Sequence, residues 1–171
     1  MLGAAALSPV SGTSQRTGLT STVAQEPVRS AKDTWRQLES LACGDSQIKL
    51  SMRLDKATKH VPQASADKAL MYVFESDRNR FSQIKLAVDR KWVGVTKGRT
   101  YFFVLLDPGP HYFCSDLLGD HTLLSLVVEA GKTYYLEQRE VTTGPEIDLM
   151  DEEKAQIQML MCKLSTFEEK K

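Results

Sequence analysis

YFFVLLDPGPHYFCSDL, residues 101–117, joins two apolar runs through a tight turn, and this pattern determines the fold class that we predict. In the turn, Pro108 presets the first central φ angle and Gly109 accepts a positive φ, as a type II turn requires. The run at 101–106 is apolar on both faces, as in a central strand covered on two sides. Because no helix fits between the runs, we expect antiparallel strands joined by a hairpin and exclude a parallel α/β fold.

Similar short strands are predicted on both sides of this stretch, from alternating or compact apolar patterns. They lie at residues 48–54, 69–74, 84–88, 92–95, 123–128 and 134–141. Their spacing and tight turns, including one at 129–132, predict an antiparallel β-sandwich of about seven to eight strands. Arg90 follows Asp89 where a turn glycine is usual, which argues against a tight two-residue hairpin there. Tyr134 and Tyr135 should face opposite sides of the sheet, one of them bonding its hydroxyl to backbone at the sandwich edge.

Apolar residues recur with helical spacing near the two ends of the chain. Asp33 can cap a short helix that stops at Gly44. Asp148 or Asp151 can cap a C-terminal amphipathic helix, which we expect to pack on the sandwich through one apolar stripe. The stripe consists of Ile157, Leu160, Met161 and Leu164. We therefore divide the chain into a disordered tail or remnant signal segment (1–30), a short helical extension (31–47), the β-sandwich (48–145) and a C-terminal helix with tail (146–171).

The N-terminal segment is rich in Ser, Thr, Gly and Ala, and its apolar patch at 2–10 lacks the preceding basic residues of a secretory signal. A start upstream of Met1 would leave Thr22 and Ala24 as the small residues before a cleavage at Gln25, and a plain flexible tail is the alternative. No run reaches the roughly 18 apolar residues of a transmembrane helix, so we expect no membrane span. The expected location is exported: periplasmic, extracellular or associated with the cell envelope.

Three cysteines allow one disulfide and one remaining thiol, and spacing alone does not fix the pairing. We favour Cys43 with Cys114, because that bridge would connect the N-terminal helix to a strand and stabilise the fold by a few kcal/mol. Such a bond persists in an oxidising compartment. In the cytosol these cysteines and Cys162 would instead be small buried apolar residues.

Charge is balanced over the whole chain, with 22 basic and 22 acidic residues. This balance excludes a protein that holds nucleic acid or an anionic membrane through a large basic excess. The segment 78–99 is locally basic and contains aromatic residues, so it is a candidate binding patch for an anionic glycan, a lipid headgroup or an envelope protein. The residues of this patch are Arg90, Lys91, Trp92, Lys97 and Arg99. The alternative is a set of solvated charges that protect strand edges from aggregation.

The sequence contains residues that suggest chemistry, but their spacing argues against most reactive sites. The sequence GKT at 131–133 lacks the earlier glycine of a phosphate loop and is not followed by a helix. His111 and Cys114 are three apart on a predicted strand, point to opposite faces and are poorly placed to share a zinc ion with Cys43 and His121. We therefore expect no metal, cofactor or catalytic residue. The alternatives are a hydrolase or transferase site formed by His111, Asp116, Asp120 and His121, or a carrier for a small apolar ligand between the sheets.

A family resemblance rests on four motifs in a fixed order along residues 68–141. They are KALMYV (68–73), VD (88–89) followed by WVG (92–94), LDPGPH (106–111) and EAGKTYYL (129–136). This order resembles the bacterial domain of unknown function 2846 family, many of whose members are lipoproteins or exported proteins. The LDPGPH step is also similar to the PEGA-type repeats of sugar- and envelope-associated proteins. The resemblance implies a β-sandwich and offers no catalytic residue, and the sequence before Cys43 does not form a lipoprotein signal.

From these observations we predict a non-enzymatic β-sandwich module of an exported or cell-envelope protein, which acts by binding or scaffolding. These motifs specify the fold and do not identify a ligand. An envelope protein and an anionic glycan are the partners that the basic segment favours.

Overall fold

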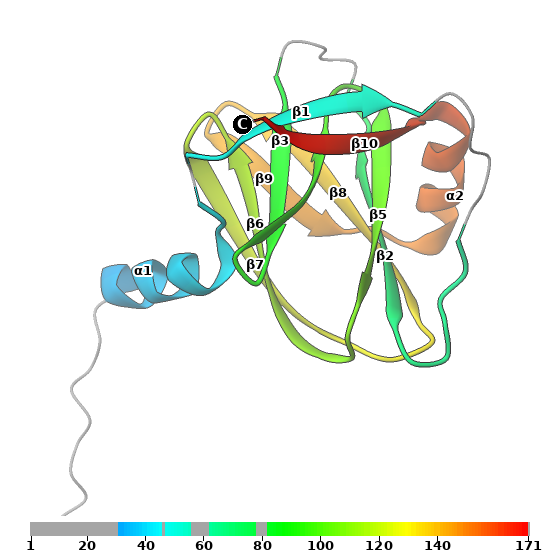
Figure 1. The fold of residues 1–171 in the computed structure, drawn as a ribbon, viewed down its shortest axis with the longest axis horizontal. Coiled ribbons are helices and arrows are strands. Elements are labelled where there is room, and N and C mark those ends of the chain that lie inside the picture. Colours follow the sequence, from blue (N-terminus) through cyan, green and yellow to red (C-terminus); the bar gives the residue numbers. More distant parts are fainter. Residues whose placement is uncertain (1–30, 46, 56–61, 78–81, 171) are drawn as a thin grey trace, which may run out of the picture.

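The computed structural model describes residues 31–45, 47–55, 62–77 and 82–170 of the chain (Figure 1). This part of the chain is mainly β, with two sheets that are mostly antiparallel, one helix near each end, and ten strands. The predicted fold class is therefore confirmed. The predictions for residues 1–30, including the signal segment, lie outside the described residues.

In the described part of the chain, the larger sheet has six strands and the smaller sheet has four. In spatial order the larger one contains β1 (Lys49–Leu54), β10 (Lys163–Lys170), β5 (Thr100–Leu106), β2 (Ala69–Glu75), β8 (Thr133–Val141) and β9 (Gly144–Leu149). The smaller one contains β4 (Lys91–Thr96), β3 (Ile84–Val88), β6 (Gly109–Leu117) and β7 (Asp120–Val128). Neighbouring strands are antiparallel except for the pairs β2–β8 and β5–β10, which are parallel. The helices are α1 (Ala31–Ala42) and α2 (Glu152–Met161).

The turn at 107–109 connects two strands that do not pair with each other, so the expected hairpin is wrong. It leads from β5 in the six-stranded sheet to β6 in the four-stranded sheet, and the turn at 129–132 leads back from β7 to β8. Lys68 lies between the two crossings, because its side chain forms an ion pair with Asp107 and its carbonyl accepts the N–H of Gly131. Turn residues specify that the chain reverses, whereas long-range pairing decides which sheet receives the next strand.

The turn between β3 and β4 is a tight two-residue hairpin, contrary to the expectation from Arg90. Asp89 and Arg90 both have positive φ angles, 48° and 71°, and Val88 pairs directly with Lys91. Contacts outside the turn hold this conformation. The Asp89 carboxylate accepts the N–H of Tyr112, and the Arg90 N–H donates to the Ala42 carbonyl at the end of α1. These bonds offset the strain that a non-glycine residue has at positive φ.

Hydrophobic side chains form three layers, and the central layer lies between the two sheets. It contains Met71, Val73, Leu86, Val88, Phe102, Phe113 and Leu136, all nearly inaccessible to solvent. The helix α2 covers part of the outer face of the six-stranded sheet, where Ala155 packs near Tyr72 and Phe74. The outer face of the four-stranded sheet packs against the end of α1, where Ala42 meets Trp92 and Cys114. The all-apolar strand β2 is explained by this arrangement, because both of its faces are buried.

The C-terminal part differs from the predicted helix with tail. The helix is confined to 152–161, with Asp151 as its N-cap, and it is flanked by the strands β9 and β10. Most of the predicted apolar stripe is exposed, since Ile157 is 52%, Leu160 88% and Met161 48% accessible. Leu164 belongs to β10 instead. The helix packs through the small side chain of Ala155, and apolar periodicity alone did not reveal this packing.

The two tyrosines after the second crossing follow the prediction. Tyr134 packs against the central layer and Tyr135 against the layer under α2, so the rings lie on opposite faces of β8. The Tyr134 hydroxyl accepts a hydrogen bond of 3.0 Å from the Glu129 N–H and thereby closes the crossing from β7. The ring of Tyr135 also stacks on Tyr72.

Candidate functional site

A disulfide joins Cys43, directly after α1, to Cys114 on β6, as predicted. The bond closes a long loop, because the two residues are 71 positions apart in the sequence. Cys114 is completely buried, and the Cys43 N–H donates to the Glu39 carbonyl in the last turn of α1. The third cysteine, Cys162, is free and buried, and burial raises the pKa of its thiol to about 11. The disulfide thus attaches the N-terminal helix to the four-stranded sheet.

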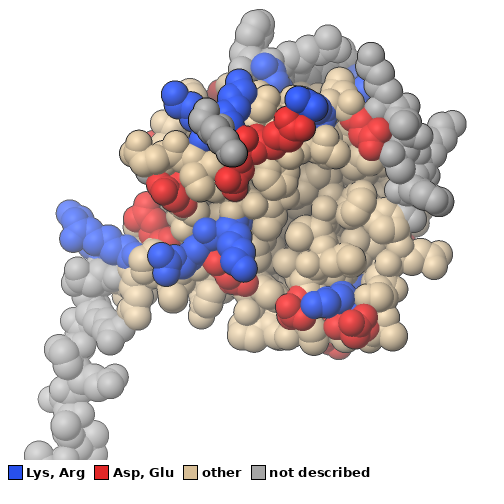
Figure 2. All heavy atoms as spheres, in the orientation of Figure 1, with Lys and Arg blue, Asp and Glu red and all other residues tan. Residues whose placement is uncertain are grey.

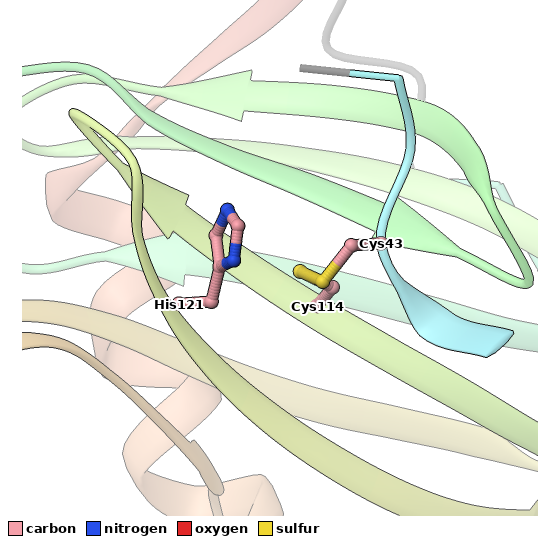
Figure 3. Close-up of side chains that lie close together, drawn as sticks. All are labelled: Cys43, Cys114 and His121. Atoms are coloured by element: carbon pink, nitrogen blue, oxygen red, sulfur yellow. A yellow bond between two sulfur atoms is a disulfide. The ribbon is translucent and has the colours of Figure 1, made fainter. Parts of the chain in front are cut away.

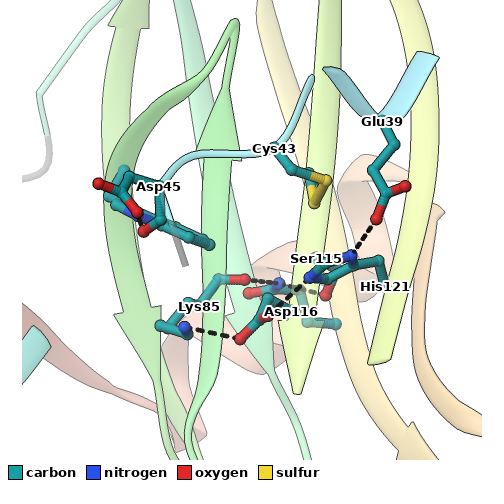
Figure 4. Close-up of a disulfide and its surroundings, with 10 residues drawn as sticks. Glu39, Cys43, Asp45, Lys85, Ser115, Asp116 and His121 are labelled. Atoms are coloured by element: carbon teal, nitrogen blue, oxygen red, sulfur yellow. Dashed lines mark hydrogen bonds and ion pairs between the residues drawn. A yellow bond between two sulfur atoms is a disulfide. The ribbon is translucent and has the colours of Figure 1, made fainter. Parts of the chain in front are cut away.

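A row of acidic and basic side chains, which we call the charge row, crosses the sheet beside the disulfide (Figure 4). His121 on β7 contacts Glu39 of α1 through Nδ1 at 2.7 Å and Asp116 of β6 through Nε2 at 2.9 Å. Asp116 in turn forms an ion pair of 2.8 Å with Lys85 of β3. Strand register explains the row, because Lys85, Asp116 and His121 are directly opposite one another on three neighbouring strands. The buried carboxylate of Asp116 is therefore held from both sides.

The same histidine lies against the disulfide. Ligand atoms of Cys43, Cys114 and His121 are all within 4.8 Å of one another. Figure 3 shows the His121 ring beside the two sulfur atoms. The predicted spacing of His111 and Cys114 disfavours a zinc site. The pairing of β6 with β7 instead brings His121 to the two cysteines.

An open hollow with a volume of about 700 Å³ lies at the end of the sandwich beside this row, and we call it the lysine hollow. Its lining residues are Ile48, Lys49, Leu50, Ser82, Gln83, Lys85, Lys97, Asp116, Leu118, Gly119 and Lys170. Lys49 on β1 and Lys170 on β10 are direct cross-strand neighbours. In Figure 2, basic and acidic side chains gather along the edge that carries β1 and β10, and uncharged side chains cover the middle of the same face. Among the described residues, four lysines and a single acid line the hollow.

A second open hollow of about 760 Å³ lies on the other side of the charge row, and we call it the helix hollow. It is lined by Arg36, Glu39, Ser40, Cys43, Gly44, Asp45, Arg90 and His121. The end of α1 forms one wall, and the turn between β3 and β4 contributes Arg90. Cys43 and His121 are therefore accessible from this hollow, whereas Cys114 is buried.

The five residues of the predicted basic and aromatic patch do not gather at one place. Arg90 and Lys91 lie at the first end of β4, with Arg90 in the helix hollow. Lys97 and Arg99 follow the other end of β4, where Lys97 lines the lysine hollow. Trp92 is buried beneath the segment 43–45, its Nε1–H donates 2.9 Å to the Asp45 carbonyl, and the Lys85 ammonium lies 4.6 Å from the centre of its ring.

Lys49 and Lys170 line the lysine hollow but were not among the predicted site residues. Lys49 lies on the polar side of an alternating strand, and that pattern was visible. The position of Lys170 depends on β10, a strand that the sequence pattern does not predict. The part of the basic segment at 78–81 lies outside the described residues.

A buried acid, Glu75 at the end of β2, lies in the polar interior between the sheets. Its Oε1 accepts the Gly98 N–H at 2.8 Å, and its Oε2 has no hydrogen-bond partner among the residues that the structure describes. Burial raises the pKa of Glu75 to about 7. Next to it, Gln138 accepts from Thr96 and donates to Ser115. This network sets Glu75 apart from the paired acids of the charge row.

The residues of the alternative enzyme site are only partly together. His121 and Asp116 are in contact, but His111 lies near the other end of β6, where Nδ1 is 2.6 Å from Asp89 and Nε2 is 2.7 Å from the Asp107 carbonyl. Burial acts to lower the pKa of His111, but these hydrogen bonds outweigh it and raise the pKa above its ordinary value. Asp120 pairs with Leu117 at the turn between β6 and β7. His111 therefore holds two turns together, away from His121.

In comparisons with known proteins, no protein-family model, curated protein or solved structure matches this chain. Neither α1 nor α2, the helices of the described part of the chain, has the length and apolar character needed to cross a bilayer. The fold and the site together define a disulfide-linked β-sandwich with a lysine-lined hollow at one end.

Proposed function

We propose that the chain is a non-enzymatic binding module of an exported or cell-envelope protein, and that it takes an anionic ligand in the lysine hollow. The observation that carries the proposal is the excess of positive charge in a concave site. Lys49, Lys97 and Lys170 line the hollow. Within the described chain, the lysines that form ion pairs are Lys68, Lys85, Lys132 and Lys154. Three ammonium groups of the hollow therefore have no ion-pair partner among the described residues.

The arrangement of these lysines favours an anion rather than a neutral ligand. Lys49 and Lys170 are directly opposite on β1 and β10, and like charges in that position destabilise a strand pair by up to about 1 kcal/mol. Asp116 does not relieve this repulsion, because it is already held by Lys85 and His121. A sulfate, phosphate or carboxylate group between the lysines would remove the repulsion and gain attraction in a partly enclosed site. An acidic glycan of the cell envelope has this chemistry.

Export is supported by the disulfide, because such bonds persist in oxidising compartments. The resemblance to an exported family points the same way. The test is thiol alkylation followed by mass spectrometry on protein purified from its natural compartment. We expect Cys162 alone to be alkylated, after unfolding, and alkylation of Cys43 and Cys114 without a reductant would contradict the exported form.

Calorimetric titration with a sulfated, uronate-containing oligosaccharide at low salt tests the ligand. The double variant Lys49→Ser with Lys170→Ser should bind at least tenfold more weakly than the unaltered chain. The matched control, Lys91→Ser with Lys132→Ser, removes the same charge outside the hollow and should change affinity less than twofold. Equal losses in both pairs would show that net charge alone attracts the probe, and absence of binding to the unaltered chain would reject an acidic glycan.

A second candidate is a hydrolase or transferase, and the contact between His121 and Asp116 is the observation that favours it. His121 also faces the helix hollow, where a substrate has access. The variant His121→Ala decides between the proposals. If His121→Ala abolishes an activity of the unaltered chain and leaves the oligosaccharide affinity unchanged, the chain is an enzyme. The proposal of a purely non-enzymatic binding module is then wrong.

A further inference from the structure

We propose that the chain has a second, redox-gated binding site: when the disulfide is reduced, Cys43, Cys114 and His121 bind one zinc ion. The ligand atoms of these three residues already lie within 4.8 Å of one another. In a tetrahedral zinc site, thiolate sulfurs lie about 3.8 Å apart and about 2.3 Å from the metal. After the S–S bond is cleaved, we expect rotation of the freed side chains to bring the ligand atoms to that geometry.

The donor atoms suit zinc in particular. Two thiolates and one imidazole are ligands that zinc prefers over harder cations such as magnesium or calcium. A metal-bound histidine usually donates its second N–H to a carboxylate, which fixes the ring and increases its basicity. Asp116 already occupies that position at 2.9 Å from Nε2, is itself buried, and is held by Lys85. Nδ1 is therefore the nitrogen that we assign to the metal.

Glu39 supplies the fourth ligand. Its Oε1 lies 2.7 Å from His121 Nδ1, and Glu39 precedes Cys43 by one helical turn, so both residues lie on the same side of the end of α1. Displacement of the Nδ1 contact by the metal would leave this carboxylate beside the open coordination position. The helix hollow, which Glu39, Cys43 and His121 all line, gives the ion a path from solvent.

The two states of the site exclude each other, because each uses both sulfur atoms. A dithiol reductant transfers two electrons and two protons: its own thiols become a disulfide, and the bond between Cys43 and Cys114 becomes two thiols. Zinc binding then releases the two thiol protons. In both states α1 stays attached to β6, by a covalent bond in an oxidising compartment and by the metal in a reducing one.

The experiment is a cobalt titration of the full, untagged chain, since Co²⁺ reports thiolate ligands by a charge-transfer band and tetrahedral geometry by its visible bands. Protein reduced with a phosphine and desalted without oxygen should bind one equivalent, which Zn²⁺ then displaces. The oxidised chain, with the same sequence and sheets, should show neither band. Circular dichroism follows the fold in each sample.

Variants separate the assigned ligands from other candidates. His121→Ala should weaken Co²⁺ binding to the reduced chain at least tenfold, and Glu39→Gln should weaken it several-fold. His111→Ala and Cys162→Ala, which alter the other described histidine near β6 and the free thiol, should change it less than twofold. Any of three results overturns the proposal: no cobalt bands in the reduced chain, equal losses for His111→Ala and His121→Ala, or loss of the fold on reduction with zinc present. None of them affects oligosaccharide binding by the oxidised chain.

Discussion

Replacement of the buried acid Glu75 by glutamine should change how the stability of the protein depends on pH. Glu75 is 2% accessible, and only one of its two carboxylate oxygens has a hydrogen-bond partner among the described residues. Burial raises its pKa to about 7, and the nearby acids Asp77 and Glu140 act in the same direction. The folded chain therefore binds this proton more tightly than the unfolded chain does, and glutamine imitates the protonated form.

The sign and size follow from linkage between proton binding and folding. Because the folded-state pKa lies above the ordinary value of 4.5, the favourable contribution of Glu75 is complete below about pH 4.5 and is lost as the pH rises through about 7. The difference between these pKa values corresponds to about 3 kcal/mol of unfolding free energy. Glu75→Gln should therefore match the unaltered chain at about pH 4.5 and exceed it by about 3 kcal/mol at about pH 8.5.

Urea unfolding at a series of pH values measures this difference. The matched control is Glu137→Gln on the neighbouring strand β8. Burial acts to raise the pKa of Glu137, but hydrogen bonds from Lys154 and Ser76 lower it below the ordinary value. The Glu137→Gln variant should be less stable than the unaltered chain. The difference in unfolding free energy should reach its full size above about pH 4.5 and vanish in acid. Parallel pH profiles for Glu75→Gln and the unaltered chain would refute the reasoning about Glu75.

Three further predictions concern stability and use the same urea assay at neutral pH. Replacing Cys43 and Cys114 together by serine should cost about 4 kcal/mol, because their bond closes a loop of 71 residues; a loss below about 1 kcal/mol would contradict this. Gly94→Ala should cost about 3 kcal/mol, since a Cβ atom there would lie 2.3 Å from the Phe102 ring; an unchanged midpoint would show that the ring moves freely. Leu160→Ser should change stability by less than about 0.5 kcal/mol, as 88% of Leu160 is accessible, and a larger loss would restore the predicted helix stripe.

Most strands were predictable because their apolar patterns are local. The run at 101–106 and the run at 112–117 are both strands, and the alternation at 48–54 corresponds to β1. The two strands that were missed lack such patterns. β9 begins with Gly144 and Pro145. Among the described strands it pairs with β8 alone, as an edge strand, where a proline without an N–H is tolerated. β10 is rich in charged residues, and the end that pairs with the start of β1 is exposed to solvent.

The candidate site was less predictable, because strand register and not local pattern assembles it. Cys43 and Cys114 could be paired from the positions of a helix end and a strand, and the structure confirms that bond. Lys85, Asp116 and His121 meet because they are direct cross-strand partners. A shift of one residue in either pair would turn these side chains to the opposite face. The segments at 84–88, 112–117 and 120–128 do not specify that register individually.

The proposed anion site is tested most directly by amide chemical-shift mapping with the oligosaccharide. Binding in the lysine hollow predicts the largest shifts at Lys49, Lys97 and Lys170, with little change at the turn between β3 and β4. The same titration of the Lys49→Ser and Lys170→Ser double variant should show these shifts greatly reduced. Shifts centred on Arg90 and Lys91, or spread evenly over all basic residues, would contradict the account.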